Sequence, residues 1–257
     1  MRALVKTVMS IAADLRIVDD LRGLSHAAAE EFVTQAAGTV RANGRFTVAL
    51  SGGSTPKSLF GLLATNFRDQ LPWDKMFFFW GDERHVPPDS PESNYRMANE
   101  ALLSKVPVST ENVFRVRAEN PDADRAAQEY EKTLQDFFQL SAGTFPRFDL
   151  ILLGLGPDGH TASLFPKTIA LQEKSRLVVA NWVDKFKTHR ITFTLPVLNN
   201  AAVVNFLVGG ADKAETVREV LEGSQPPEMF PAKLVRPTNG RLMWMVDQAA
   251  AAALSKP

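Results

Sequence analysis

Asp158 and His160 are the residues of this chain best placed to do chemistry, since they lie two positions apart in one short loop. Histidine exchanges protons readily near neutral pH, and a neighbouring carboxylate can orient its ring. The chain has four histidines, and His160 is the one in a segment rich in glycine. We therefore expect His160 to transfer a proton and Asp158 to orient the imidazole or a water molecule. The alternative is a purely structural role for this pair.

A predicted strand positions these two side chains. The apolar block from Leu150 to Gly154 indicates a buried strand, whereas residues 155–160 contain too much glycine and proline to form a helix or strand. In open α/β sheets, ligands bind in the loops that follow the carboxyl ends of the strands. The Asp158–His160 loop is therefore expected at the ligand-binding edge of a sheet.

The same loop matches a weak dinucleotide-binding pattern. Gly154, Gly156 and Gly159 fit Gly-x-Gly-x-x-Gly, a fingerprint that requires a helix to begin inside the motif. Pro157 interrupts the glycines, and no acidic residue ends a clear second strand about 20 positions further on. We therefore predict no nucleotide cofactor, and the chain needs no other cofactor for the chemistry inferred below.

Three further segments place polar residues after predicted strands. The first has the composition of a phosphate cradle, because glycines let backbone N–H groups approach an anion and the following helix offers its N-terminus. It consists of Ser51, Gly52, Gly53, Ser54 and Thr55. It lacks the Gly-Lys-Ser/Thr ending of a Walker A loop, and taken alone it could be a tight turn with a Ser/Thr cap.

The second segment is Gly81–His85 and the third is Gly209–Lys213. Arg84 could pair with a carboxylate or polarise a carbonyl group, although a run of charges is usually a solvated surface. His85 is expected to support its loop, and His26 and His189 are assigned structural roles. Lys213 taken alone would be a surface lysine. Since loops after parallel strands gather at one edge of a sheet, the convergence of these segments indicates a single site.

Strand-like and helix-like segments alternate along the whole chain, which predicts an α/β fold with a mostly parallel, Rossmann-like open sheet flanked by helices. Two closely spaced strands, 177–183 and 190–194, could form an antiparallel insertion. No linker interrupts the pattern, so one domain is expected over residues 1–257, with a short N-terminal extension and an alanine-rich tail. The other expected strands are 15–18, 46–50, 75–80, 149–153, 202–208 and 242–246, and the expected helices are 25–40, 93–103, 122–138, 212–221 and one that opens at Pro56.

Composition excludes several classes of function. The 257 residues include 29 Lys and Arg against 29 Asp and Glu, so no net charge favours nucleic acid or acidic membranes. The absence of cysteine excludes disulfides and thiolate chemistry, and the scattered histidines argue against a metal site. No apolar run approaches the ~20 residues of a membrane span. Residues 1–13 only faintly resemble a signal peptide, so a cytoplasmic location is expected.

Several long motifs in order resemble those of the bacterial 6-phosphogluconolactonases, which are grouped with the glucosamine-6-phosphate deaminases. They are Leu50-Ser-Gly-Gly-Ser-Thr-Pro56, Trp80-Gly-Asp-Glu-Arg-His-Val-Pro87 with Ser93-Asn94, Leu153-Gly-Leu-Gly-Pro-Asp-Gly-His-Thr-Ala-Ser-Leu-Phe-Pro166, Arg190-Ile-Thr-Phe-Thr194 and Gly209-Gly-Ala-Asp-Lys213. The resemblance runs from about residue 15 to residue 246. One departure is Lys167, where this family usually has glycine.

The resemblance implies hydrolysis of 6-phosphoglucono-δ-lactone to 6-phosphogluconate in the oxidative pentose phosphate pathway. The deaminases continue to an acid where this chain has Phe165, and have tyrosine where it has Arg84. His160 would act as general base on water, with Arg84 stabilising charge on the carbonyl oxygen. Arg190 and Lys213 would join residues 51–55 in holding the 6-phosphate.

The lactonase function implied by the resemblance predicts a small-molecule partner, no nucleic acid or membrane partner, no metal, and a monomer or small homo-oligomer. A sugar-phosphate sensor without activity is the alternative from another class, but such a protein would have no need for the Asp158–His160 pair. Sensors of this kind usually also carry a DNA-binding helix-turn-helix, and no basic helical module precedes the first predicted strands.

Overall fold

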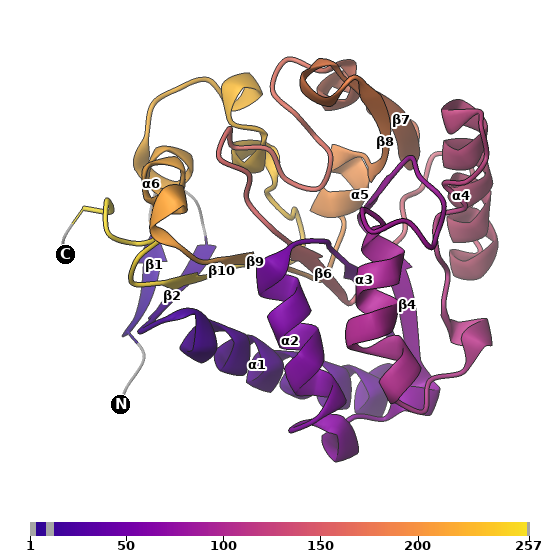
Figure 1. The fold of residues 1–257 in the computed structure, drawn as a ribbon, viewed down its shortest axis with the longest axis horizontal. Helices are drawn as coiled ribbons and strands as arrows, with labels where there is room; N and C mark the ends of the chain where they lie inside the picture. The colour runs from indigo at the N-terminus through magenta and orange to yellow at the C-terminus, as the bar shows by residue number, and fades with distance from the viewer. Residues whose placement is uncertain (1–3, 9–12, 256–257) are drawn as a thin grey trace.

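The computed structural model describes residues 4–8 and 13–255, and it has a large and a small β-sheet (Figure 1). The large sheet has seven strands in the order β1-β2-β10-β9-β6-β3-β4. Every neighbouring pair in it is parallel except β1 with β2. Its strands are β1 (Leu4–Val8), β2 (Ala13–Val18), β3 (Phe46–Leu50), β4 (Met76–Trp80), β6 (Leu150–Leu153), β9 (Val203–Val208) and β10 (Arg241–Asp247). The predicted α/β fold with a mostly parallel sheet is confirmed.

The small sheet has three antiparallel strands in the order β5-β8-β7. These are β5 (Asp82–Arg84), β7 (Val178–Val183) and β8 (Thr188–Phe193). The predicted antiparallel pair 177–183 and 190–194 is therefore present, and β5 joins it as a third strand. Because β5 follows β4 after a single residue, Gly81, the chain passes directly from the large sheet into the small one.

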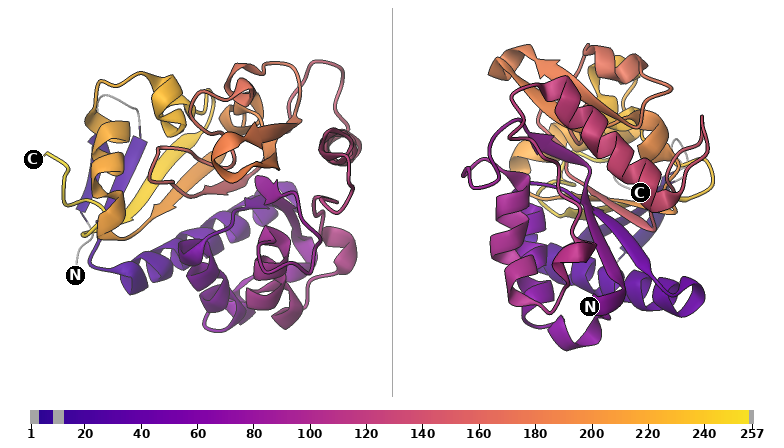
Figure 2. Two further views of the ribbon diagram at one scale, coloured as in Figure 1. Left: turned by 45° about the horizontal axis from the view of Figure 1, so that its top comes forward. Right: turned by 90° about the vertical axis from the view of Figure 1, so that its right-hand side faces the viewer.

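Helices cover both faces of the large sheet, with α1, α2 and α3 on one side and α6 and the small sheet on the other (Figure 2). Helix α4 packs against β7 and β8. The helices are α1 (Leu21–Asn43), α2 (Ser54–Ala64), α3 (Asn94–Ala101), α4 (Ala123–Phe138), α5 (Leu195–Asn199) and α6 (Ala214–Glu222). This arrangement explains why the central strands are almost entirely apolar, since a strand covered on both faces has no solvated side.

The core lies on the central strands. All residues of β3, β6 and β9 are buried. Phe206 on β9 and Trp244 on β10 are cross-strand neighbours, and their rings stack with centroids 4.0 Å apart. Burial of large aromatic side chains contributes most to a core of this kind. The sheet that carries the loops described below is therefore a rigid support.

Four neighbouring strands, β9, β6, β3 and β4, end in the loops that sequence analysis singled out. The loops begin at Gly209, Gly154, Ser51 and Gly81. The chain order of the strands reverses between β3 and β6, which is the switch point where open α/β sheets bind their ligands. The predicted gathering of these loops at one edge is thus realised in the fold.

Candidate active site

A pocket of about 440 Å³ lies at this edge of the sheet. All of the site residues predicted from the sequence line it, except Asp158. The lining residues are Ser51–Pro56, Asp82, Arg84, Asn94, Gly154–Gly156, His160–Ser163, Phe165, Phe186, Arg190, Leu207–Gly209, Asp212 and Lys213. Both sheets contribute, since Arg84 and Arg190 belong to the small sheet.

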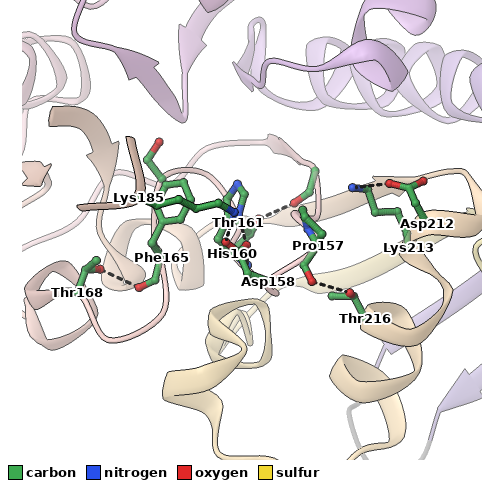
Figure 3. Close-up of polar contacts among 12 residues, drawn as sticks. Pro157, Asp158, His160, Thr161, Phe165, Thr168, Lys185, Asp212, Lys213 and Thr216 are labelled. Carbon is green, nitrogen blue, oxygen red and sulfur yellow. Dashed lines mark hydrogen bonds and ion pairs between the residues drawn. The ribbon is translucent and has the colours of Figure 1, made fainter. Parts of the chain in front are cut away.

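His160 and Asp158 contact each other directly, through Nδ1 of the imidazole and Oδ1 of the carboxylate (Figure 3). A carboxylate oxygen accepts, so this contact places a proton on Nδ1. The same oxygen accepts from the backbone N–H of His160 at 3.3 Å. Nε2 has no hydrogen-bond partner among the described residues, and the ring lines the pocket. Nε2 is therefore the ring nitrogen that remains available to a ligand in the pocket.

Asp158 does not line this pocket, but a neighbouring groove beside Phe230 and Lys185. Asp158 can therefore orient the imidazole. A water molecule in the pocket would contact His160 and not Asp158. Burial alone would raise the pKa of Asp158, but hydrogen bonds and charge from His160, together with Lys185, hold that pKa well below its ordinary value. Asp158 is consequently a carboxylate throughout the neutral range.

Glycines in the loop make room for the ring. A Cβ atom on Gly156 would lie 2.0 Å from Nδ1 and Cε1 of His160, so the ring occupies the space that any other residue would need. Gly159 has φ +74°, in the left-handed region where glycine carries no steric penalty. The N–H of Gly156 donates to the carbonyl oxygen of His160 at 2.9 Å and closes the turn. No helix begins between Gly154 and Gly159, in contrast to a dinucleotide-binding fingerprint.

Phe165 packs flat on the imidazole, with ring centroids 4.0 Å apart and an interplanar angle of 22°. Its side chain is 5% exposed. An aromatic ring here shields one face of His160 from water and supplies no proton-transfer group. The structure thus shows Phe165 as a packing partner of His160.

The Ser51–Thr55 loop lines the pocket. The hydroxyl of Ser51 is buried and has no hydrogen-bond partner in the described structure. Gly53 (φ +110°) precedes α2, and no side chain caps that helix. Gly52 lies against Asn94, whose Oδ1 would be 1.9 Å from a Cβ at position 52. Buried polar groups without a partner are expected where a ligand supplies one, which supports the predicted anion cradle.

Two arginines meet across neighbouring strands at the pocket. Arg84 on β5 and Arg190 on β8 are register partners. Burial and the charge of Arg84 both lower the pKa of Arg190. Like charges placed opposite each other in a sheet are destabilising. An anion bound between or beside the two guanidinium groups would offset this repulsion. Lys213 adds a third cation, which Asp212 pairs at 3.0 Å.

Asp82 had no assigned role in the sequence analysis. Its side chain is buried, and Oδ2 accepts from the hydroxyl of Ser163 at 2.6 Å. The amide of Asn94 donates to its backbone oxygen at 3.0 Å. Asp82 therefore ties the His160 loop to β5 and α3. The position of Asp82 directly after a predicted strand was the one feature of the sequence that pointed to it. Its partners Ser163 and Asn94 lie 81 and 12 residues away, and spacing along the chain does not reveal such contacts.

The other histidines lie outside the pocket. Nε2 of His85 contacts the carbonyl oxygen of Asn120 at 2.6 Å, which anchors its loop. His26 packs edge-on against Phe67, and His189 packs against Trp182. These contacts agree with the structural roles that we expected for all three.

Among the described residues, no group of three or more His, Cys, Asp or Glu side chains is arranged to hold a metal ion. No helix in residues 4–8 and 13–255 has the length and apolar character needed to cross a membrane.

Comparison with known families assigns the class of protein that this sheet and pocket define. The family described as glucosamine-6-phosphate isomerases/6-phosphogluconolactonase matches residues 19–244. The chain therefore belongs to this family. A 6-phosphogluconolactonase of Synechocystis is 47% identical over 207 residues, covering 80% of this chain and 84% of the relative. A 6-phosphogluconolactonase of Nostoc is 42% identical over 241 residues, covering 94% of this chain and 98% of the relative.

Solved structures agree with this assignment. A 6-phosphogluconolactonase from Leishmania guyanensis has a TM-score of 0.85 at 30% identity, with 96% of this chain and 100% of that one covered. A monomeric glucosamine-6-phosphate deaminase has a TM-score of 0.75 at 22% identity, with 93% and 99% covered. The second likeness shows that the fold is shared across both branches of the family.

Proposed function

We propose that this chain hydrolyses 6-phosphoglucono-δ-lactone to 6-phosphogluconate in the oxidative pentose phosphate pathway, as a 6-phosphogluconolactonase like the relatives that it resembles. The observation that carries the proposal is the position of His160, which is held by Asp158 through Nδ1 and lines a pocket that also holds Arg84, Arg190 and Lys213. A general base and a cluster of cations in one pocket suit a substrate that has both a reactive carbonyl and a phosphate. The curated relatives, at 42–47% identity, support the same activity.

In the proposed mechanism, Nε2 of His160 accepts a proton from water as the water oxygen attacks C1 of the lactone. The C1–O bond to the ring oxygen then breaks, and the imidazolium returns the proton to that leaving oxygen. Asp158 holds the ring through Nδ1 and stabilises the imidazolium that forms in between. General acid–base catalysis of this kind contributes about 10²–10⁴-fold.

The phosphate would lie between the Ser51–Thr55 loop and the basic residues. Arginine offers a planar pair of donors to phosphate oxygens and lysine a point charge. We assign Arg190 and Lys213 to the phosphate. Because Arg84 is the register partner of Arg190, we propose that it shares the phosphate, in place of the carbonyl role predicted from the sequence.

The decisive assay measures acid release from freshly generated 6-phosphoglucono-δ-lactone and subtracts the spontaneous rate. We expect a large enzymatic rate that a chelator does not reduce. Glucosamine 6-phosphate should release no ammonia, since Phe165 replaces the acid of the deaminases and packs on His160. A lactone rate equal to the spontaneous one would refute the proposal, and so would ammonia release at a comparable rate.

A further inference from the structure

The Asp158–His160 pair has a third member in the fold, Lys185. Its ammonium nitrogen donates to Oδ2 of Asp158 at 3.2 Å, while Oδ1 of the same carboxylate contacts the imidazole (Figure 3). Lys185 was not among the residues selected from the sequence. It comes from the turn between β7 and β8, 27 residues along the chain, and spacing gives no signal that it approaches Asp158.

The turn that carries Lys185 borders both the pocket, through Phe186, and the neighbouring groove, through Lys185. It is a 3-10 turn, Asp184–Phe186, and it ends at Lys187 with φ +51°. Phe186 lines the pocket, and its ring lies 5.8 Å from that of Phe165 and 5.3 Å from the guanidinium of Arg190. The ammonium nitrogen of Lys185 also lies over this ring, 5.4 Å from its centroid. This one turn thus contacts three residues around His160. They are Phe165, which packs on its ring, Asp158, which bonds Nδ1, and Arg190, which we assign to the phosphate.

We propose that Lys185 is a positioning residue, which fixes the carboxylate of Asp158 so that Nδ1 of His160 is held and Nε2 is presented to the substrate. This inference rests on the proposed lactone hydrolysis. A carboxylate bonded at one oxygen can rotate about its Cβ–Cγ bond, whereas one bonded at both oxygens by partners on different loops cannot do so without breaking a contact. Lys185 supplies the second bond, on the side away from the pocket.

Lys185 also opposes protonation of the base, since its charge and that of an imidazolium would share one carboxylate. Without the ammonium, the full negative charge of Asp158 would act on His160, and the ring would become protonated at a higher pH. Lys185, Asp158 and His160 are 55%, 29% and 23% exposed, so solvent weakens this effect. The other charged groups that line the pocket and the groove stay the same when Lys185 alone is changed. They are Asp82, Arg84, Lys167, Asp184, Arg190, Asp212 and Lys213.

The test is Lys185→Met in the full chain, with Lys187→Met as the matched control. Lys187 lies in the same turn but pairs with Asp184 at 2.6 Å instead of Asp158. For Lys185→Met we expect kcat to fall by roughly threefold to fivefold with little change in KM, because exposed ion pairs are weak and Lys185 does not line the pocket. The acid limb of the pH profile should move to higher pH by a few tenths of a unit. Lys185→Arg should restore both values, and Lys187→Met should match the wild type.

A nuclear magnetic resonance titration of the His160 ring separates this inference from the proposed function, because it needs no turnover. The titration midpoint should rise in Lys185→Met and not in Lys187→Met. A wild-type chain without lactonase activity would refute the function and leave this readout intact. An unchanged acid limb and midpoint in Lys185→Met would overturn the positioning role, as would a change confined to KM or equal changes in both variants.

Discussion

His160 gives one ring nitrogen to Asp158 and presents the other to the pocket, so its two nitrogens have separate roles. Replacing it by asparagine removes the proton acceptor and keeps a polar group of moderate size. We expect kcat/KM for the lactone to fall at least ~10²-fold, the scale of general base catalysis. His26→Asn, on α1 and outside the pocket, is the matched control and should retain full activity. Thermal unfolding of both variants checks that the fold is intact.

The same residues set the pH dependence of the wild type. Since its pKa is lowered, Asp158 stays charged as the pH falls from neutral, and its contribution to stability is lost only as the pH drops through that lowered value. A protonated imidazole cannot accept a proton from water. Activity should therefore decline in acid while the protein is still folded, which parallel measurements of rate and circular dichroism would show.

For the His160→Asn variant, retention of more than about a tenth of the wild-type activity would remove His160 from the base role.

At the residue scale, the sequence predicted which side chains meet but not how they divide the work. Ser51, Arg84, His160 and Lys213 could be selected because each lies in a segment that follows a predicted strand, whereas Arg190 was selected through the family resemblance. Asp158 could be selected too, yet only the folded turn shows that it lies behind the ring and not in the pocket. Whether Asp158 lies behind the His160 ring or in the pocket depends on the backbone angles of the turn, such as φ +74° at Gly159. The residue types alone do not specify these angles.

At the scale of elements, the loop after His160 contains a strained position. Lys167 has φ +61°, in the left-handed region that non-glycine residues enter at a cost of about 1–2 kcal/mol. The glycine expected at this position from the family resemblance would carry no such penalty. Lys167→Gly should leave lactone hydrolysis unchanged, because Lys167 does not line the pocket. It should also raise the free energy of unfolding by up to about 1 kcal/mol, since relief of strain exceeds the added entropy of the unfolded chain.

Lys174→Gly is the control for that change, because Lys174 is exposed and its backbone lies outside the left-handed region. Glycine there should destabilise by ~0.5–1 kcal/mol. Urea unfolding of the two variants gives the comparison. If both lose stability equally, the backbone at Lys167 is not strained in solution.

The two elements that carry the basic residues give a prediction about substrate choice. Arg190 on β8 and Lys213 before α6 would each hold the phosphate, so Arg190→Gln or Lys213→Met should reduce kcat/KM for the phosphorylated lactone. Loss of one partner of a desolvated charge pair costs ~2–5 kcal/mol, or roughly 30-fold and more. Most of the loss should appear in KM, because the phosphate does not change during the reaction.

Unphosphorylated gluconolactone is the control substrate in that experiment, since it never makes these contacts. Its slow hydrolysis should hardly change in either variant. Should a variant slow both lactones by the same factor, the residue acts on the fold or on the reacting carbonyl and the phosphate assignment is wrong. Arg84→Gln in the same assay decides whether Arg84 belongs with the phosphate, as its register with Arg190 suggests, or with the carbonyl.

The elements that sequence analysis missed are short. The strand β5 has three residues, all charged, and its pairing with β8 depends on a partner more than 100 residues away. Helix α5 has five residues and Pro196 in its first turn, too few for a helical period to show. Strand β1 lies in the segment taken as an N-terminal extension, and it pairs antiparallel at the edge of the sheet. Long elements with a clear start signal were predicted well, as for α4, whose cap Asp122 accepts from the N–H of Arg125 at 3.1 Å.

At the scale of the whole molecule, alternation predicted a parallel sheet but not its strand order. The order β9-β6-β3-β4 brings together loops that begin at Gly209, Gly154, Ser51 and Gly81, and these come from segments spread over most of the chain. Such pairings are decided by how the strands and helices pack together. The convergence of the loops could still be inferred, because every parallel strand sends its carboxyl end to the same edge, whatever the order.

This arrangement makes the pocket a property of the complete fold. Its walls come from both sheets and from the start of α2, so unfolding destroys it, and a ligand that binds only the folded state must stabilise the whole chain. We expect 6-phosphogluconate at about 100 times its Kd to add about 2.7 kcal/mol. For a chain of this size that corresponds to a rise of roughly 5–10 °C in the midpoint of thermal unfolding.

Gluconate without the phosphate should give little or no rise, and Arg190→Gln and Lys213→Met should lose most of the rise given by 6-phosphogluconate. Lys187→Met, which removes a charge outside the pocket, should keep it. Calorimetry on the four proteins with each ligand measures these differences directly. If gluconate stabilised the wild type as much as 6-phosphogluconate does, the cluster of Arg84, Arg190 and Lys213 would not be a phosphate site, and the like charges paired across β5 and β8 would need another anion to balance them.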